Sequence, residues 1–205
     1  MQELRFQDNS FSLNNSQKYN LSIQVSLDGF SFLMQDSVTK SFCYLSHTLY
    51  CLSGEYGLIK KTSELLKLYG LTNTQFNSTT ILFGNKTLRL IPSTFSNEKN
   101  IKQLPGFRSK ELKDRKLIVS PLTGKYQLLF LMASELYDIF AQLFPGSVFM
   151  HEVQSVINST FSNKPSSSIL VDCIVHNQFI LISVVNDSEI LFLNSFNVRD
   201  RKSVV

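Results

Sequence analysis

LSIQVSLDGFSFLM, residues 21–34, contains the pattern that decides the fold class. Apolar side chains alternate with polar ones on both sides of Asp28-Gly29, which is a strong signal for a tight hairpin between two strands. After a polar turn at 36–40, residues 42–45 supply a third apolar segment. The stretch therefore predicts a three-stranded antiparallel meander.

A second stretch, near the end of the chain, repeats this organisation. Residues 169–193 read ILVDCIVHNQFILISVVNDSEILFL, and a constant offset of 148 positions (169 minus 21) aligns them with the first meander without a gap. His176-Asn177 then falls on Asp28-Gly29. The two segments share almost no identical residues, so the repeat is one of pattern, and a chance match of two meanders is the alternative.

The sequence that follows the first meander switches to helical spacing. Residues 54–69 carry an apolar stripe on one helical face, and Gly70 is placed to end that helix. We interpret residues 72–123 as an insertion outside the core. Within it, short apolar segments on both sides of Gly84-Asn85 predict another tight hairpin.

Regular patterns return with residues 126–132, a nearly continuous apolar run that is typical of a strand buried on both faces. Ser134 is placed to cap a helix over 135–144. A short strand at 147–150 and a second helical stripe over 153–161 follow. The order strand, helix, strand, helix predicts parallel strands joined by right-handed crossovers.

The composition is that of a globular protein. Of the 205 residues, 43% are apolar, and no apolar run reaches the roughly 18 residues of a membrane span. The first 19 residues are polar and lack the apolar stretch of a secretory signal. Three cysteines in apolar contexts predict buried thiols in a reducing compartment, here a soluble cytoplasmic domain; they are Cys43, Cys51 and Cys173.

Residues 200–205, DRKSVV, are expected to be translated sequencing adapter, because their codons can spell the start of a common library adapter. A genuine basic tail is the alternative. Without these six residues the formal charge falls from +4 to +3, that is, 18 basic against 15 acidic residues. Such a mild charge does not predict a nucleic-acid partner.

Three antiparallel strands, alternating helices and strands, and a second meander together predict an α/β fold with two lobes. This organisation resembles the actin-like ATPase (ribonuclease-H-like) superfamily. The chain also resembles an uncharacterised bacterial family, domain of unknown function 3822. That resemblance rests on residues 21–25 (LSIQV), residues 87–92 (TLRLIP), Phe144-Pro145 with His151 just beyond, and residues 191–196 (LFLNSF).

The resemblance also implies domain boundaries. One complete lobe is expected over residues 17–163, with an insertion at about 72–123. The start of a second lobe is expected over 166–199, followed by the adapter residues 200–205. Because similar proteins continue well past this point, the second lobe is expected to be truncated.

In active actin-like ATPases, the first hairpin of each lobe grips phosphate. An Asp positions the metal ion through water, and a Gly lets backbone N–H groups approach the phosphates. In this sequence Gln24 and Ser26 stand at those positions in the first lobe, while Asp172 keeps the carboxylate in the second and Ile174 replaces the Gly. The resemblance therefore implies Gln24, Ser26 and Asp172 as candidate cofactor-binding residues. No cofactor and no catalytic residue are expected, and ATP with Mg²⁺ is the alternative.

One group of residues has the spacing of metal ligands. Cys43, His47 and Cys51 recur at every fourth position, which on a helix would align three ligands on one face. Residues 42–45 read as a strand, however, and no fourth ligand is evident. Core packing is therefore favoured, and no metal site is expected.

The remaining candidate residues have simpler explanations than a functional site. His151 is expected to be a surface residue, and His176 to lie in a solvated turn. The basic run at 108–116 is interrupted by acidic residues and lacks an aromatic platform, so it predicts a solvated face. Ser120 and Ser134 lack the nucleophile elbow or neighbouring base that a catalytic serine needs.

These observations favour a non-catalytic actin-like scaffold or protein-interaction module with degenerate nucleotide motifs. Its expected partner is an unidentified protein, with no nucleic acid and no membrane span. The alternative is an ATP-binding actin-like ATPase or kinase-like enzyme with atypical phosphate loops.

Overall fold

The structure is a computed structural model that describes residues 2–95, 101, 103–105, 107, 112–123, 125–163, 168–186 and 189–198. The expected adapter residues 200–205 lie outside the described residues. So do residues 164–167, at the predicted boundary between the lobes, and residues 108–111 of the basic run.

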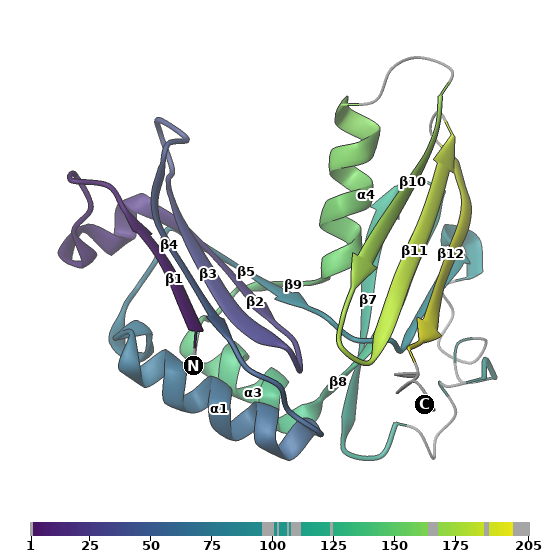
Figure 1. Cartoon of the computed structure of the whole chain (residues 1–205), viewed down its shortest axis with the longest axis horizontal. Coiled ribbons are helices and arrows are strands. Elements are labelled where there is room, and N and C mark those ends of the chain that lie inside the picture. The colour runs from purple at the N-terminus through teal and green to yellow at the C-terminus, as the bar shows by residue number, and fades with distance from the viewer. Residues whose placement is uncertain are drawn as a thin grey trace, which may run out of the picture.

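Figure 1 shows two halves side by side, and the first is built on a six-stranded sheet. Four neighbouring strands of this sheet are antiparallel, and the last of them is β2 (Tyr19–Val25). The sheet continues with β5 (Ser78–Phe83), which is parallel to β2, and with β9 (Val148–His151), which is parallel to β5. Two helices, α1 (Glu55–Leu68) and α3 (Ser134–Leu143), pack on the sheet through a shared core. The strand order is β1 (Gln2–Gln7), β4 (Phe42–Leu49), β3 (Gly29–Asp36), β2 (Tyr19–Val25), β5 (Ser78–Phe83) and β9 (Val148–His151).

The second half contains the repeated meander. It forms a separate antiparallel sheet of β10 (Ile169–Val175), β11 (Phe179–Asn186) and β12 (Glu189–Asn197). The two predicted meanders, here called the first and second ribbon, therefore lie in different sheets. Helix α4 (Glu152–Asn163) packs against β10 and β11. The predicted first lobe ends with α4, which contacts β9 of the main sheet as well as the second ribbon.

A third sheet lies behind this ribbon in Figure 1. Its strands are β6 (Leu88–Pro92), β8 (Tyr126–Ala133) and β7 (Arg115–Thr123), with β8 in the centre. Side chains on one face of β8, among them Leu128 and Phe130, join the main core. Those on the other face form a second cluster, which comprises Ile91, Ile101, Phe107, Leu129 and Leu131.

Two predictions about these strands are wrong. β5 lies in the middle of the main sheet with Ile81 fully buried, although the sequence places residues 72–123 outside the core. β5 and β6 belong to different sheets, so Gly84-Asn85 is not a hairpin turn but a crossing between the two halves. A period-two pattern predicts a strand but does not identify its neighbour, which explains the error.

The predicted parallel crossover from residues 126–132 is also wrong. β8 is buried on both faces as expected, but its two neighbours are antiparallel. A central antiparallel strand covered on both faces carries the same continuous apolar run as a strand in a parallel sheet. The strand that takes the predicted place in the parallel part of the main sheet is β5.

Most of the predictions about the helices are confirmed. α1 buries the predicted stripe, including Leu58 and Leu65, and Gly70 adopts the left-handed conformation with φ of 69°. Ser134, the predicted cap, is instead the first residue of α3, and Ala133 takes the N-cap position. Short 3₁₀ segments occur at Leu13–Lys18, Leu71–Asn73 and Ser93–Phe95.

The membrane and cysteine predictions have different outcomes. Among the described helices, none has the length and apolar character needed to cross a bilayer. Cys43 is buried as predicted, whereas Cys51 and Cys173 are exposed. Cys173 lies on the outward face of β10, where an alternating strand pattern exposes every second residue.

Candidate functional site

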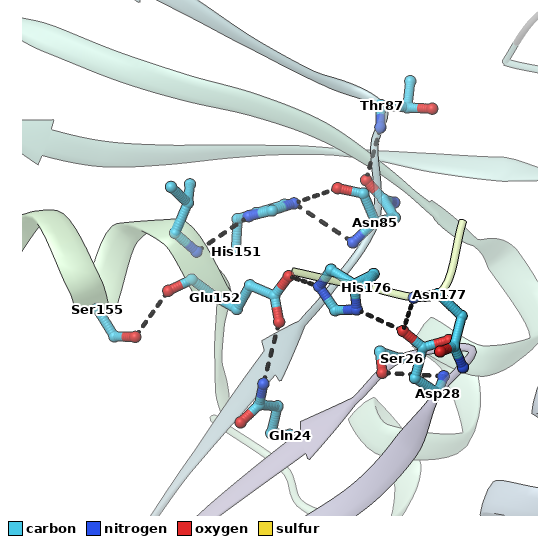
Figure 2. Close-up of polar contacts among 11 residues, drawn as sticks. Gln24, Ser26, Asp28, Asn85, Thr87, His151, Glu152, Ser155, His176 and Asn177 are labelled. Atoms are coloured by element: carbon cyan, nitrogen blue, oxygen red, sulfur yellow. Dashed lines mark hydrogen bonds and ion pairs between the residues drawn. The ribbon is translucent and has the colours of Figure 1, made fainter. Parts of the chain in front are cut away.

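The turns of the two repeated hairpins meet each other. Asp28 follows β2, and His176 follows β10, at the same position of the repeat. The Nδ1 atom of His176 donates a hydrogen bond to Oδ2 of Asp28 at 2.9 Å. The backbone N–H of Asn177 donates to the same oxygen at 2.9 Å (Figure 2). Two loops 148 residues apart are therefore joined through one carboxylate.

Glu152 provides a second carboxylate at this junction. It is the first residue of α4 and follows β9 directly, and only 3% of it is exposed. One carboxylate oxygen accepts from Nε2 of His176 at 2.5 Å, and the other accepts from Nε2 of Gln24 at 3.0 Å. This buried charge is stabilised by hydrogen bonds to both oxygens and by its position at the N-terminus of a helix. We call Gln24, Asp28, Glu152 and His176 the junction cluster.

Gly84 leaves the space that the Glu152 carboxylate occupies. Gly84 follows β5, and its N–H donates to the carbonyl of Val25 at the end of β2. A Cβ atom at this position would lie 2.6–2.9 Å from the three carboxylate atoms of Glu152. Real Cβ atoms are essentially never that close to another heavy atom, so any larger residue would displace the carboxylate.

His176 carries a proton on each ring nitrogen when it bonds both carboxylates, because each nitrogen must donate. Burial by itself lowers the pKa of His176, but the hydrogen bond and charge of Glu152, followed by those of Asp28, raise that pKa above its ordinary value. The ring also stacks on Phe179 with centroids 4.3 Å apart. The prediction of a solvated His176 is therefore wrong, since the residue is buried and paired.

His151 is likewise buried, so the prediction of a surface residue is wrong. Burial lowers the pKa of His151, more than the nearby Glu152 charge raises it. In the neutral ring, Nδ1 accepts from the N–H of Val153 at 3.2 Å, and Nε2 therefore carries the proton and donates to the carbonyl of Asn85 at 2.9 Å. His151 thus fixes the crossing loop that begins at Gly84.

The three candidate cofactor residues do not come together. Gln24 lies in the junction cluster. Ser26 is adjacent to it and accepts the N–H of Asp28 at 3.2 Å. Asp172 instead accepts from the hydroxyl of Thr160 on α4 at 2.9 Å. It lies four residues along the strand from His176, roughly 13 Å away. Asp172 therefore contributes to the packing of α4 on β10.

The junction does not have the features of a phosphate-binding site. Among the described residues, the glycines with positive φ are Gly70 and Gly146, and neither lies in a hairpin turn of the repeat. Two carboxylates, those of Asp28 and Glu152, occupy the space between the turns, and His176 bonds both of them. These residues form a bridge between the two hairpin turns.

The residues with metal-ligand spacing are also separated. His47 on β4 pairs with the hydroxyl of Ser31 through Nδ1 at 2.6 Å, and Cys43 is buried. Within the described ranges, no group of three or more His, Cys, Asp or Glu residues is arranged to hold a metal ion.

Sequence reasoning missed the role of Glu152, although part of the signal was present. The constant offset of the repeat already aligns Asp28 with His176, a residue pair of complementary charge. Glu152 lies outside the repeat, beside a histidine at a strand end, and no spacing rule connects it to either hairpin. Only the path of β9 and α4 between the two sheets brings it there.

Comparisons with known proteins agree with this architecture. The sequence matches the family described as "Protein of unknown function (DUF3822)" over residues 8–205. A crystal structure from Bacteroides thetaiotaomicron, of a protein with an actin-like ATPase fold and unknown function, superposes with a TM-score of 0.82 at 18% identity, covering 93% of this chain and 74% of that one. The fold is therefore actin-like.

Two further solved structures match with lower TM-scores. The cytoplasmic domain of EpsL, an inner membrane component of the type II secretion system of Vibrio cholerae, has a TM-score of 0.44 and 9% identity, covering 88% of this chain and 69% of that one. The PilM-PilN type IV pilus biogenesis complex has a TM-score of 0.49 and 10% identity, covering 86% and 60%. No curated protein is detectably similar in sequence.

Proposed function

We propose that this chain, which belongs to the DUF3822 family of proteins of unknown function, is a non-catalytic actin-like module that binds another protein. In this proposal its hairpin turns are joined by the chain's own side chains and not by a nucleotide. The observation that carries it is the position of His176, which bonds Asp28 on one side and Glu152 on the other.

A nucleotide would have to displace the side chains that lie between the hairpin turns. A phosphate group that entered between the turns would meet two carboxylates, and it would have to break the hydrogen bonds that satisfy them. Removing one partner of such a buried ion pair costs roughly 3–5 kcal/mol. A phosphate would also need unobstructed backbone N–H groups, whereas the Glu152 carboxylate covers Gly84.

Protein binding is the class of function that remains once nucleotide chemistry is set aside. The outward face of the β10–β12 sheet carries a row of exposed apolar residues, which favours a protein contact over a nucleic-acid contact. The row includes Ile169, Val171, Val175, Phe192 and Phe196. The formal charge of +4 is too small to favour nucleic acid.

Isothermal titration with ATP and Mg²⁺, combined with a phosphate-release assay, tests the proposal. We expect neither heat of binding nor released phosphate. Micromolar binding accompanied by turnover would establish the ATPase alternative, and Asp172→Ala should then abolish the turnover. Chromatography on heparin at physiological salt tests for nucleic-acid binding, which depends on salt. We expect no retention.

A further inference from the structure

The tip of the β10–β11 hairpin contacts the first half of the molecule through the buried ring of Phe179, which belongs to the main core, and through a small set of polar contacts. His176 bonds Asp28 and Glu152, and the backbone of Asn177 bonds Asp28. A weaker contact joins the Gln178 side chain to the carbonyl of Leu52 at 3.4 Å. The side-chain bonds of His176 are therefore the central elements of this attachment.

Both bonds depend on a single proton. A doubly protonated imidazole donates from both nitrogens, whereas a neutral imidazole has one donor and one lone pair. When His176 is neutral, one of its nitrogens therefore directs a lone pair at a carboxylate oxygen 2.5–2.9 Å away. That contact is repulsive, and the carboxylate keeps only its other donor, which is the N–H of Asn177 for Asp28 and the side-chain amide of Gln24 for Glu152.

The other groups around His176 do not reproduce this behaviour. The titratable groups that face it are Asp28 from the β2–β3 turn, Glu152 from α4 and His151 from the end of β9. Burial, and to a smaller extent Asp28, raise the pKa of Tyr50, so this phenol stays neutral through the alkaline range. Phe179, the ring that stacks on His176, does not ionise.

We infer that protonation of His176 controls the docking of the β10–β11 tip onto the β2–β3 turn, so that the junction cluster acts as a pH-sensitive latch between the two halves of the molecule. The latch deepens the proposed function and rests on it, because both assign the junction cluster to joining the hairpin turns. A latch of this kind would let local pH or a competing charged partner alter the angle between the two sheets.

The direction of the pH effect follows from the raised pKa of His176. The latch is fully formed below the unfolded-state pKa of about 6.5, and it is lost as the pH rises through the folded-state pKa of His176. His151, whose pKa is lowered by burial, acts in the opposite direction, because its contribution to stability is lost as the pH falls below about 6.5.

A distance measurement between the halves tests the inference. One spin label is attached to Cys173 on β10, and the other to Val38→Cys in the β3–β4 turn, where Val38 is 85% exposed. Cys51→Ser removes the other exposed thiol, and Cys43 is buried. From about pH 6 to about pH 9.5, we expect the distance distribution to shift from one population to a longer one.

Three variants in the labelled protein separate the latch from general effects of pH. His176→Gln should give the longer distance at every pH. His176→Arg, which stays charged and can donate to both carboxylates, should keep the shorter distance at every pH. His151→Gln should retain the transition of the unsubstituted protein. Circular dichroism on each variant verifies that the fold is intact.

The latch is overturned if the distances at the two ends of the pH range coincide while the fold is intact, or if His176→Arg opens with pH as the unsubstituted protein does. If His176→Gln fails to fold, the His176→Arg comparison still decides. Failure of the proposed function has a different signature, because ATP binding with turnover would be detected by titration whether or not the label distance changes with pH.

Discussion

At the residue scale, one glycine and one glutamate define the junction between the hairpin turns. Glu152 could not adopt its position if residue 84 had a side chain, because its carboxylate lies where the Cβ atom would be. The same carboxylate accepts hydrogen bonds from Gln24 and His176. A buried charge is thus accommodated by a neighbour without a side chain and by two hydrogen-bond donors.

Gly84→Ala is expected to lower the free energy of unfolding by roughly 1–3 kcal/mol, because the carboxylate cannot move without breaking its hydrogen bonds. Urea denaturation measures the change. Gly57→Ala is the matched control, since its nearest contact is Leu52 Cδ2 at an ordinary 3.6 Å; it should increase stability by roughly 0.5–1 kcal/mol. A Gly84→Ala protein as stable as the unsubstituted one would show that Glu152 is not confined.

At the scale of elements, helix α4 connects the junction to the second ribbon. Its first residue, Glu152, lies at the junction, while Thr160, two turns later, bonds Asp172 on β10. Asp172 is also 3.4 Å from the hydroxyl of Ser183 on β11. The carboxylate that the family resemblance suggested for a nucleotide therefore holds a helix against a sheet.

Asp172→Ala and Thr160→Val each remove this hydrogen bond and are each expected to lower the free energy of unfolding by about 1 kcal/mol. The double variant should lose less than the sum of the two, because both substitutions remove the same interaction. Chemical denaturation of all four proteins gives the coupling energy directly. Purely additive losses would mean that the bond between α4 and β10 contributes nothing to stability.

At the scale of the whole molecule, the two faces of the β10–β12 sheet are unequal. The inner face packs under α4 and into the main core, with Leu181 and Val185 almost fully buried. The outer face exposes Val171 by 64% and Val175 by 70%. An apolar face of this kind is available for contact with another surface.

Val171→Lys should leave the stability nearly unchanged and reduce binding of a hydrophobic dye, because the side chain already faces solvent. Val185→Lys, the same substitution on the buried face, should abolish folding, since an unpaired charge would enter the core. Thermal melts and dye fluorescence distinguish the two variants. Equal destabilisation by both would contradict the assigned orientation of the sheet.

The sequence by itself determined the elements that depend on short-range patterns. Both meanders, their turns at Asp28 and His176, and α1 with its closing Gly70 follow from periodicity and turn chemistry, which act over a few residues. The family resemblance likewise rested on local motifs. Two ribbons in separate sheets, arranged as in an actin-like fold, were therefore predictable.

Only the tertiary structure decided which strands are neighbours and which polar side chains meet. β5 and β8 exchanged their predicted places because a strand pattern records burial and not the identity of the pairing partner. The predictions for His151 and His176 were wrong, and the role of Glu152 was missed, for the same reason: whether such a side chain is solvated or paired depends on segments far away in the chain. Long-range packing, which no local window contains, created the junction.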